Sequence, residues 1–204
     1  MKRRKKIVVY TAISADGFVA RPRGDVAWLE RDPPKGNYGM LKFFETIDTI
    51  VKDSEPEGVG IEMDMISAVS DSGFNTYIFS PQRNEILEPG DEWASGPIKT
   101  FAQRLRALPG KDVWLIGSSV VSAFLDEGEI DEFHMLVVPI FIGQGIGVPL
   151  VQARQWPIRL KLLSSESFRD GVVYLKYGVV SKIVRSECDQ KNANLGKFRS
   201  STPP

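Results

Sequence analysis

The clearest candidate for a chemical site is a short turn that joins an apolar strand pattern to a helix pattern. Residues 113–116 are all apolar and predict a buried strand, and residues 120–125 carry apolar side chains at helical spacing. Between them, Gly117-Ser118-Ser119 directs backbone N–H groups and two hydroxyls toward one point. A helix start of this kind suits an anion, typically a cofactor phosphate. Serine is also an ordinary helix cap, so an anion site and a simple cap both stay open.

Two carboxylates and two aromatic side chains near the N-terminus are further candidates. Asp16 follows an apolar strand pattern at residues 6–13, and Asp25 lies in a loop rich in proline and glycine. Either carboxylate could hydrogen-bond an amino-heterocycle, although an Asp-Gly pair such as that at Asp16 is also a common turn. Trp28 is either an apolar anchor of the loop or a flat wall of a site. Tyr38 begins a helix pattern, where it either packs or contacts a ligand.

Several other kinds of chemistry are excluded by the residues that the chain lacks. His134 is the only histidine and Cys188 the only cysteine, which argues against a metal cluster, a Cys-His nucleophile pair and an internal disulfide. A reducing cytoplasm is the compartment that we expect. His134 lies within a strand pattern, so we expect it to be structural. The glycines of residues 143–147 open no helix, so they predict a turn or bulge rather than a dinucleotide site.

Alternating strand and helix patterns must position these candidates. Strands are expected at residues 6–13, 49–51, 76–80, 113–116, 133–142, 158–168 and 172–180, and helices at 38–47, 98–108 and 120–125. Ser95 is expected to cap the second of these helices. Strands that alternate with helices and end in an antiparallel pair predict an α/β fold, with a mixed, mostly parallel sheet and helices on both faces.

Charge and hydropathy divide the 204 residues into three parts. Residues 1–6 are expected to be a basic tail, 7–180 a single domain, and 181–204 a polar tail without regular structure. The basic ends are expected to be solvated, so we expect no nucleic-acid partner. No apolar run approaches the roughly 20 residues of a membrane helix, so we expect no membrane span.

Seven short motifs, in this order, resemble the dihydrofolate-reductase-like family, in particular the C-terminal reductase domain of the riboflavin-biosynthesis protein RibD. They occupy residues 13–20, 24–28, 47–49, 76–80, 111–117, 130–133 and 138–139, within a match over residues 7–180. The resemblance implies a three-layer α/β/α fold, a homodimer, and NADPH-dependent reduction of a pteridine-like or ribosylamino-pyrimidine compound. The alternative is a binding or regulatory protein on a degenerate reductase fold.

Carried over by position, the resemblance also implies roles for the candidate residues. Cofactor contacts are expected at Ile13, Trp28, Ser80, Arg83, Gly117, Ser118, Ser119, Val120 and Val121. Substrate contacts are expected at Asp16, Asp25 and Tyr38. No catalytic residue and no metal are implied, because the nicotinamide of such enzymes carries the hydride itself.

The expected cofactor site departs from the family pattern in three places. The turn after the predicted strand at residues 113–116 is glycine-rich in the family, whereas this chain has Gly117-Ser118-Ser119. Family members have Gly-Arg after the second predicted strand, whereas this chain has the carboxylates Asp53, Glu55 and Glu57. Like charges close to a cofactor phosphate would weaken its binding. The Ser-Arg expected after residues 76–80 is spread over Ser80-Pro-Gln-Arg83, so the preference for NADPH over NADH stays open.

Overall fold

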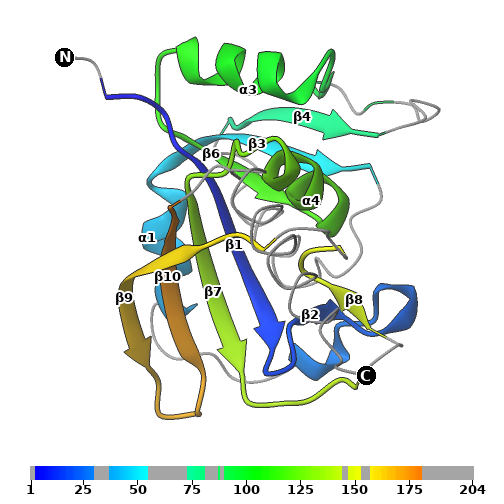
Figure 1. Cartoon of the computed structure of the whole chain (residues 1–204), viewed down its shortest axis with the longest axis vertical. Coiled ribbons are helices and arrows are strands. Elements are labelled where there is room, and N and C mark those ends of the chain that lie inside the picture. The colour runs from blue at the N-terminus through cyan, green and yellow to red at the C-terminus, as the bar shows by residue number, and fades with distance from the viewer. Residues whose placement is uncertain are drawn as a thin grey trace, which may run out of the picture.

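An eight-stranded mixed sheet forms the centre of the part of the chain that the structure describes (Figure 1). This computed structural model describes residues 3–29, 37–54, 73–80, 87, 90–143, 147–152 and 157–180. In spatial order the strands are β5 (Glu92–Trp93), β4 (Asn75–Phe79), β3 (Ile47–Asp53), β6 (Asp112–Ile116), β1 (Ile7–Ser14), β7 (Glu132–Val138), β10 (Val173–Val179) and β9 (Leu160–Ser167).

The sheet is parallel from β5 to β7 and antiparallel at β10 and β9. Strand β1 occupies its centre because it is apolar on both faces, and its first four residues are at most 2% exposed. Parallel strands covered on both faces require such continuous apolar runs. Two further strands, β2 (Phe18–Ala20) and β8 (Val148–Pro149), pair antiparallel in a separate small sheet.

Helices cover both faces of the central sheet (Figure 1). On one face lie α3 (Ile98–Ala107) and α4 (Ser118–Asp126), and on the other lies the short α1 (Met40–Phe44). Short 3-10 segments at Pro22–Gly24, Ala27–Leu29 and Asn37–Gly39 belong to the connection between β2 and α1. The predicted three-layer α/β/α fold with antiparallel C-terminal strands is therefore confirmed.

Successive side chains of β1 enter two separate hydrophobic cores, because neighbouring residues of a strand face opposite sides of the sheet. Val9 joins the core beneath α3 and α4, which contains the fully buried Phe124. Val8 and Tyr10 join the core beneath α1, which contains Trp114. The indole Nε1 of Trp114 donates a hydrogen bond to the carbonyl of Tyr10 at 3.1 Å, so this buried polar atom is satisfied.

Differences between the predicted and observed elements are confined to element ends and very short strands. Helix α3 begins after Pro97 and has no side-chain cap, so the cap predicted at Ser95 is wrong. Strand β7 ends at Val138, because the N–H of Ile140 turns back to the carbonyl of Val138 at 2.8 Å. Strands β2, β5 and β8 have two or three residues each, which is too short for a periodic signal.

The basic residues 3–6 are held against the domain by ion pairs, which corrects the expectation that they are solvated. Lys5 is only 4% exposed, and its Nζ donates to Oδ1 of Asp48 at 2.7 Å. Arg3 forms an ion pair with Asp112 at the start of β6. These contacts form because the residues before β1 run beside the ends of its neighbouring strands.

The predicted polar tail, residues 181–204, lies outside the described residues. Within the described ranges, no helix is both long and apolar enough to cross a membrane. The boundaries assigned to the tails and the domain stay predictions.

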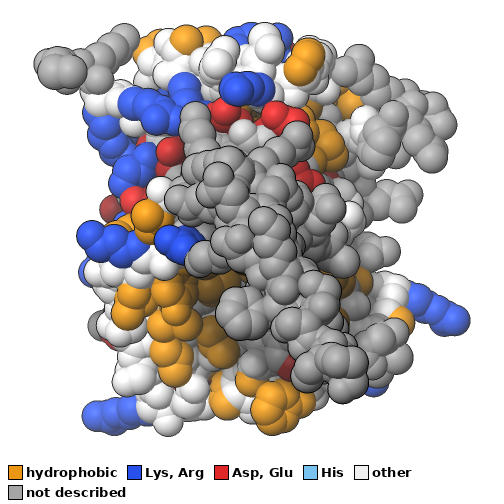
Figure 2. Space-filling model, viewed as in Figure 1, with side chains coloured by type: hydrophobic (Ala, Val, Ile, Leu, Met, Phe, Trp, Pro, Cys, Tyr) orange, Lys and Arg blue, Asp and Glu red, His pale blue; other side chains and the backbone are white. Residues whose placement is uncertain are grey.

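Strand β9 carries apolar side chains that the described chain leaves uncovered. Leu160, Leu162 and Leu163 are 41%, 50% and 47% exposed. Figure 2 shows hydrophobic side chains gathered over the region of β9 and β10. Among the described strands, β9 ends the sheet and has a neighbour only on its β10 side. Exposed leucines on an end strand favour contact with another polypeptide.

We predict that Phe124→Ala lowers the free energy of unfolding by about 3–5 kcal/mol, because it leaves a cavity between α4 and the sheet. Phe124 is fully buried and packs edge to face on Phe101 at 6.3 Å between ring centroids. Urea denaturation measures the change. Leu41→Ala, at a position that is 53% exposed, is the control and should change stability by less than about 0.5 kcal/mol. Equal losses would contradict the assigned core.

Candidate functional site

The predicted strand, turn and helix are present where β6 meets α4. Strand β6 ends at Ile116, Gly117 has a φ of +110°, and α4 begins at Ser118. A Cβ atom on residue 117 would lie 2.3 Å from Oδ2 of Asp53. Glycine is therefore required at this position both for its backbone conformation and for the close approach of Asp53.

The backbone N–H groups at the start of α4 already bind an internal carboxylate, that of Asp53. Asp53 ends β3, which pairs with β6, and the residue is only 7% exposed. Its Oδ2 accepts a hydrogen bond from Ser119 N–H at 2.9 Å, and its Oδ1 accepts one from Val120 N–H at 2.8 Å. A negative charge at this end of a helix is stabilised by the helix dipole. Asp53 therefore caps α4 from a different strand.

This contact decides between the two interpretations of the turn. The serine cap is wrong, because α4 has no side-chain cap from its own N-cap residue, and Ser118 Oγ instead donates to the carbonyl of Pro149 at 2.7 Å. An external phosphate could not share the amides of Ser119 and Val120 with the carboxylate of Asp53, because both groups are anions that need the same donors. The described residues at α4 therefore do not fit a dinucleotide phosphate.

The other predicted cofactor residues do not gather at one surface. Val120 and Val121 are at most 1% exposed and pack in the core beneath α3 and α4. Ile13 belongs to the same core, whereas Trp28 belongs to the core on the opposite face of the sheet. The fold thus uses these four side chains for packing.

The adenosine end of the predicted cofactor site is only partly described. Ser80 follows β4, whereas Arg83 and the carboxylates Glu55 and Glu57 lie outside the described residues. Their predicted roles stay predictions. Among the described residues, no group of three or more His, Cys, Asp or Glu side chains is arranged to hold a metal ion.

All three predicted substrate residues have internal hydrogen-bond partners, and the hydroxyl of Tyr38 donates to the carboxylate of Asp170. Asp16 accepts hydrogen bonds from Ser14 Oγ at 2.6 Å and from Gly143 N–H at 2.9 Å, and the Ser14 bond in particular lowers the pKa of Asp16. Asp25 accepts a hydrogen bond from Ala27 N–H at 2.9 Å. Both carboxylates stabilise turns, and a substrate contact at either one stays a prediction.

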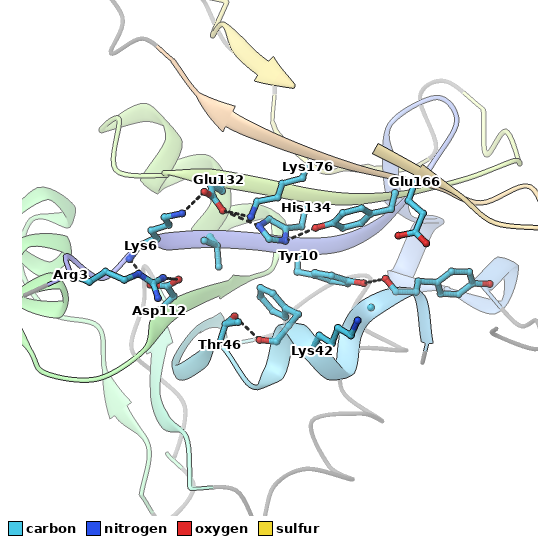
Figure 3. Close-up of a pocket in the computed structure, with 15 residues that line it drawn as sticks. Arg3, Lys6, Tyr10, Lys42, Thr46, Asp112, Glu132, His134, Glu166 and Lys176 are labelled. Atoms are coloured by element: carbon cyan, nitrogen blue, oxygen red, sulfur yellow. Dashed lines mark hydrogen bonds and ion pairs between the residues drawn. The ribbon is translucent and has the colours of Figure 1, made fainter. Parts of the chain in front are cut away.

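The third predicted substrate residue, Tyr38, lines a cavity of about 340 Å³ on the α1 face of the sheet (Figure 3). Residues of β1, β7, β10 and α1 form this cavity, together with parts of the chain beside them. We call it the polar pocket, and its lining includes Tyr10, Tyr38, Phe43, Glu132, His134 and Tyr174. Its volume is within the range of small-molecule sites.

A chain of hydrogen bonds runs along one wall of the polar pocket (Figure 3). Glu132 and His134 are two residues apart on β7 and so face the same side, next to Tyr174 on β10. Lys6 Nζ lies 2.5 Å from one oxygen of Glu132, and Lys176 Nζ lies 3.1 Å from the other. The two ring nitrogens of His134 complete the chain, with Nε2 3.2 Å from Glu132 and Nδ1 3.0 Å from the Tyr174 hydroxyl.

The environment sets the charge of each member of this chain. Burial raises the pKa of Glu132, but hydrogen bonds from Lys6 and Lys176 outweigh it and lower that pKa to about 2. Burial lowers the pKa of His134 and raises the pKa of Tyr174 to about 12. At neutral pH the pocket wall therefore consists of an ionised glutamate, a neutral imidazole and a neutral phenol.

Aromatic rings line the remainder of the polar pocket. The ring centroids of Tyr10 and Phe43 lie 4.7 Å apart, and the ring centroids of Phe43 and His134 lie 5.5 Å apart. Tyr38 packs edge-on against Phe168 at 5.0 Å. Flat apolar walls with a few oriented polar groups are typical of sites for planar ligands.

Sequence reasoning expected His134 to be structural and missed both the polar chain and the capping role of Asp53. One signal was available: Glu132 and His134 alternate on one strand, as Tyr174 and Lys176 do on another. Polar residues at alternate positions of two apolar strands suggest a shared polar face. The sequence offered no equivalent signal for Asp53, because its partners are backbone groups of a distant helix.

The fold and one matched segment show which proteins this chain resembles. Residues 97–174, which extend from α3 to β10, match the model of the RibD C-terminal domain. The sheet order and flanking helices are those of the dihydrofolate-reductase-like fold, so the resemblance inferred from the sequence motifs is confirmed.

Individual relatives agree with this assignment. The chain is 28% identical over 190 residues to the protein YyaP of Bacillus subtilis (strain 168), covering 86% of this chain and 95% of that one. A putative riboflavin biosynthesis protein from Shewanella sp. PV-4 superposes with a TM-score of 0.70 at 22% identity, covering 86% and 99%. Dihydrofolate reductase from Enterococcus faecalis, in a complex with NADP(H) and RAB-propyl, superposes with a TM-score of 0.57 at 14% identity, covering 89% of this chain and 100% of that one.

We predict that Glu132 stabilises the fold only where it is ionised. Its pKa is lowered from 4.5 to about 2, so its contribution is complete above about pH 4.5 and is lost as the pH falls toward 2. Glu132→Gln should therefore lower the urea midpoint at pH 6 and have a progressively smaller effect below pH 4.5. Glu45→Gln, at an exposed position, should leave the midpoint unchanged throughout. An effect of Glu132→Gln that is independent of pH would contradict the prediction.

Proposed function

We propose that this chain is a reductase-fold protein that binds a small planar heterocycle in the polar pocket and does not hold a dinucleotide phosphate on α4. The observation that carries the proposal is the pair of hydrogen bonds from Ser119 and Val120 to Asp53, at 2.9 and 2.8 Å. Through these hydrogen bonds, the carboxylate of Asp53 already occupies the helix amides. This favours the degenerate, ligand-binding alternative over an NADPH-dependent enzyme.

The polar pocket supports a planar ligand by its shape and lining. The rings of Tyr10, Phe43 and Tyr38 provide flat apolar surface, and the pocket of about 340 Å³ has room for one or two fused rings. Lys42 also lines the pocket and has no ion-pair partner among the described residues, so it can bind an acidic or carbonyl group of the ligand. A ring with one polar edge fits this combination.

We predict that wild type and Asp53→Gly differ in their affinity for NADPH. Both are titrated with NADPH, and binding is followed by nicotinamide fluorescence. Wild type should show no saturable binding up to millimolar NADPH. Removal of the Asp53 carboxylate frees the two amides and removes a like charge, so Asp53→Gly should strengthen any residual binding by about tenfold or more. A melting curve of the variant checks that it is folded.

Saturable NADPH binding by the wild-type protein at micromolar concentration would overturn the proposal. Ser54→Gly, which introduces a glycine one residue further along, is the matched control. It leaves the carboxylate of Asp53 in place, so its NADPH titration should resemble that of wild type.

The second candidate function is NADPH-dependent reduction of a small heterocycle, as in 5-amino-6-(5-phosphoribosylamino)uracil reductase or dihydrofolate reductase. The match of residues 97–174 to a reductase domain favours it. In that case the nicotinamide would supply the hydride, and the protein would position the two rings. Stoichiometric oxidation of NADPH in the presence of a pyrimidine or pteridine would establish this function in place of the first.

We also propose that the chain forms a homodimer through β9. Its exposed leucines would be covered by the same strand of a second copy, because an isologous contact buries the same surface on both chains. Sedimentation at micromolar concentration should give twice the 22.7 kDa chain mass. Leu162→Glu should give the monomer, whereas Leu41→Glu, at an exposed position of α1 outside β9, should remain dimeric. A monomeric wild type would contradict the proposal.

A further inference from the structure

We propose that Tyr174 is a specificity-determining residue of the polar pocket, because Glu132 and His134 orient its hydroxyl so that its oxygen accepts a hydrogen bond from the ligand. The pocket would thereby select planar rings with an N–H or amino edge. This inference rests on the proposed binding function, and it follows from the order of donors and acceptors along the chain.

The chain of hydrogen bonds in the polar pocket starts at Glu132, whose ionised side chain can only accept hydrogen bonds. Lys6 and Lys176 approach its two oxygens at 2.5 and 3.1 Å, so the carboxylate is held between two cations. Glu132 is only 8% exposed, which leaves little room for water to replace either lysine. An ionised carboxylate has lone pairs but no proton to give.

The fixed acceptor determines which nitrogen of His134 carries the proton. Nε2 lies 3.2 Å from a Glu132 oxygen and must donate to it. A neutral imidazole has one N–H, so Nδ1 is left as an acceptor. The rest of the imidazole surroundings offer no competing acceptor among the described residues: Phe43 and Tyr10 face it with their rings at 5.5 and 6.0 Å, and Lys176 on β10 is a cation.

The unprotonated Nδ1 of His134 in turn orients the hydroxyl of Tyr174. Its hydroxyl lies 3.0 Å from Nδ1 and donates its only proton there, so the lone pairs of the oxygen remain for another partner. Tyr174 is half-buried and lines the pocket, so that partner can be a ligand. The hydroxyl of Tyr10, in the same pocket, is different because it donates to the backbone carbonyl of Tyr38 at 3.1 Å.

Protonation of His134 would reverse this preference. A doubly protonated ring donates from Nδ1 to the Tyr174 oxygen, and the phenolic proton then turns toward the pocket. The charged and titratable groups that face the ring are Glu132 on its own strand, Tyr174 and Lys176 on β10, Tyr10 on β1 and Lys6 before it, and Glu166 on β9 acts on Tyr174. The pocket would therefore favour N–H ligands at neutral pH and carbonyl ligands once the imidazole is charged.

The first test uses the fact that His134 is the only histidine, so its imidazole signals need no assignment. Nitrogen-15 NMR of the wild-type protein at pH 7.5 should show a proton on Nε2 and none on Nδ1. A proton on Nδ1 would overturn the inference without affecting the proposed function. The measurement needs neither a ligand nor a variant.

The second test compares indole with benzofuran, two bicyclic rings of the same shape of which only indole has an N–H. Titrations followed by the His134 ring signals should show indole binding about fivefold more tightly, the effect of one hydrogen bond. Tyr174→Phe should abolish this ratio, whereas the control Tyr177→Phe, on the same strand but packed against the core beneath α3 and α4, should retain it. Equal affinities in wild type would overturn the inference alone. Binding of neither ring would overturn the proposed function and, with it, the inference.

Discussion

The contact between Asp53 and the first turn of α4 is the interaction on which this side of the structure depends. It joins the end of β3 to a helix that starts from β6, and it requires glycine at position 117. A buried carboxylate is tolerated here because two backbone donors and a helix dipole compensate its lost hydration. The consequence is that the first free amides of α4 are occupied by a carboxylate of the protein itself.

The polar pocket lies on the opposite face of the sheet, and the charged groups of its hydrogen-bond chain bind side chains rather than backbone amides. There the charged groups are not used up by the backbone but are arranged in series, from two lysines through Glu132 and His134 to Tyr174. Each group fixes the hydrogen-bonding direction of the next, so the half-buried hydroxyl of Tyr174 is left as an acceptor toward the pocket. Buried networks of this kind are costly when incomplete and specific when complete.

These two features explain why family resemblance and site geometry lead to different functional expectations. The resemblance depends on motifs in the apolar strands and the turns that follow them, such as the segment that contains the buried Trp114 and Gly117. Function depends on which groups reach the ends and faces of those strands. Asp53 and His134 occupy such positions, and neither alters the packing that makes the fold recognisable.

The sequence by itself determined the order of the elements, the parallel core and the antiparallel finish, because buried strands and one-sided helices leave a periodic apolar pattern. It also located the turn at Gly117 and singled out Tyr38, which lines the polar pocket. Only the tertiary structure decided what occupies the turn and what surrounds Tyr38. Asp53 meets the amides of residues 119 and 120 through the pairing of β3 with β6, and Tyr174 meets His134 through the pairing of β10 with β7. These contacts depend on which strands become neighbours in the sheet, and the pattern within one strand does not identify its neighbour.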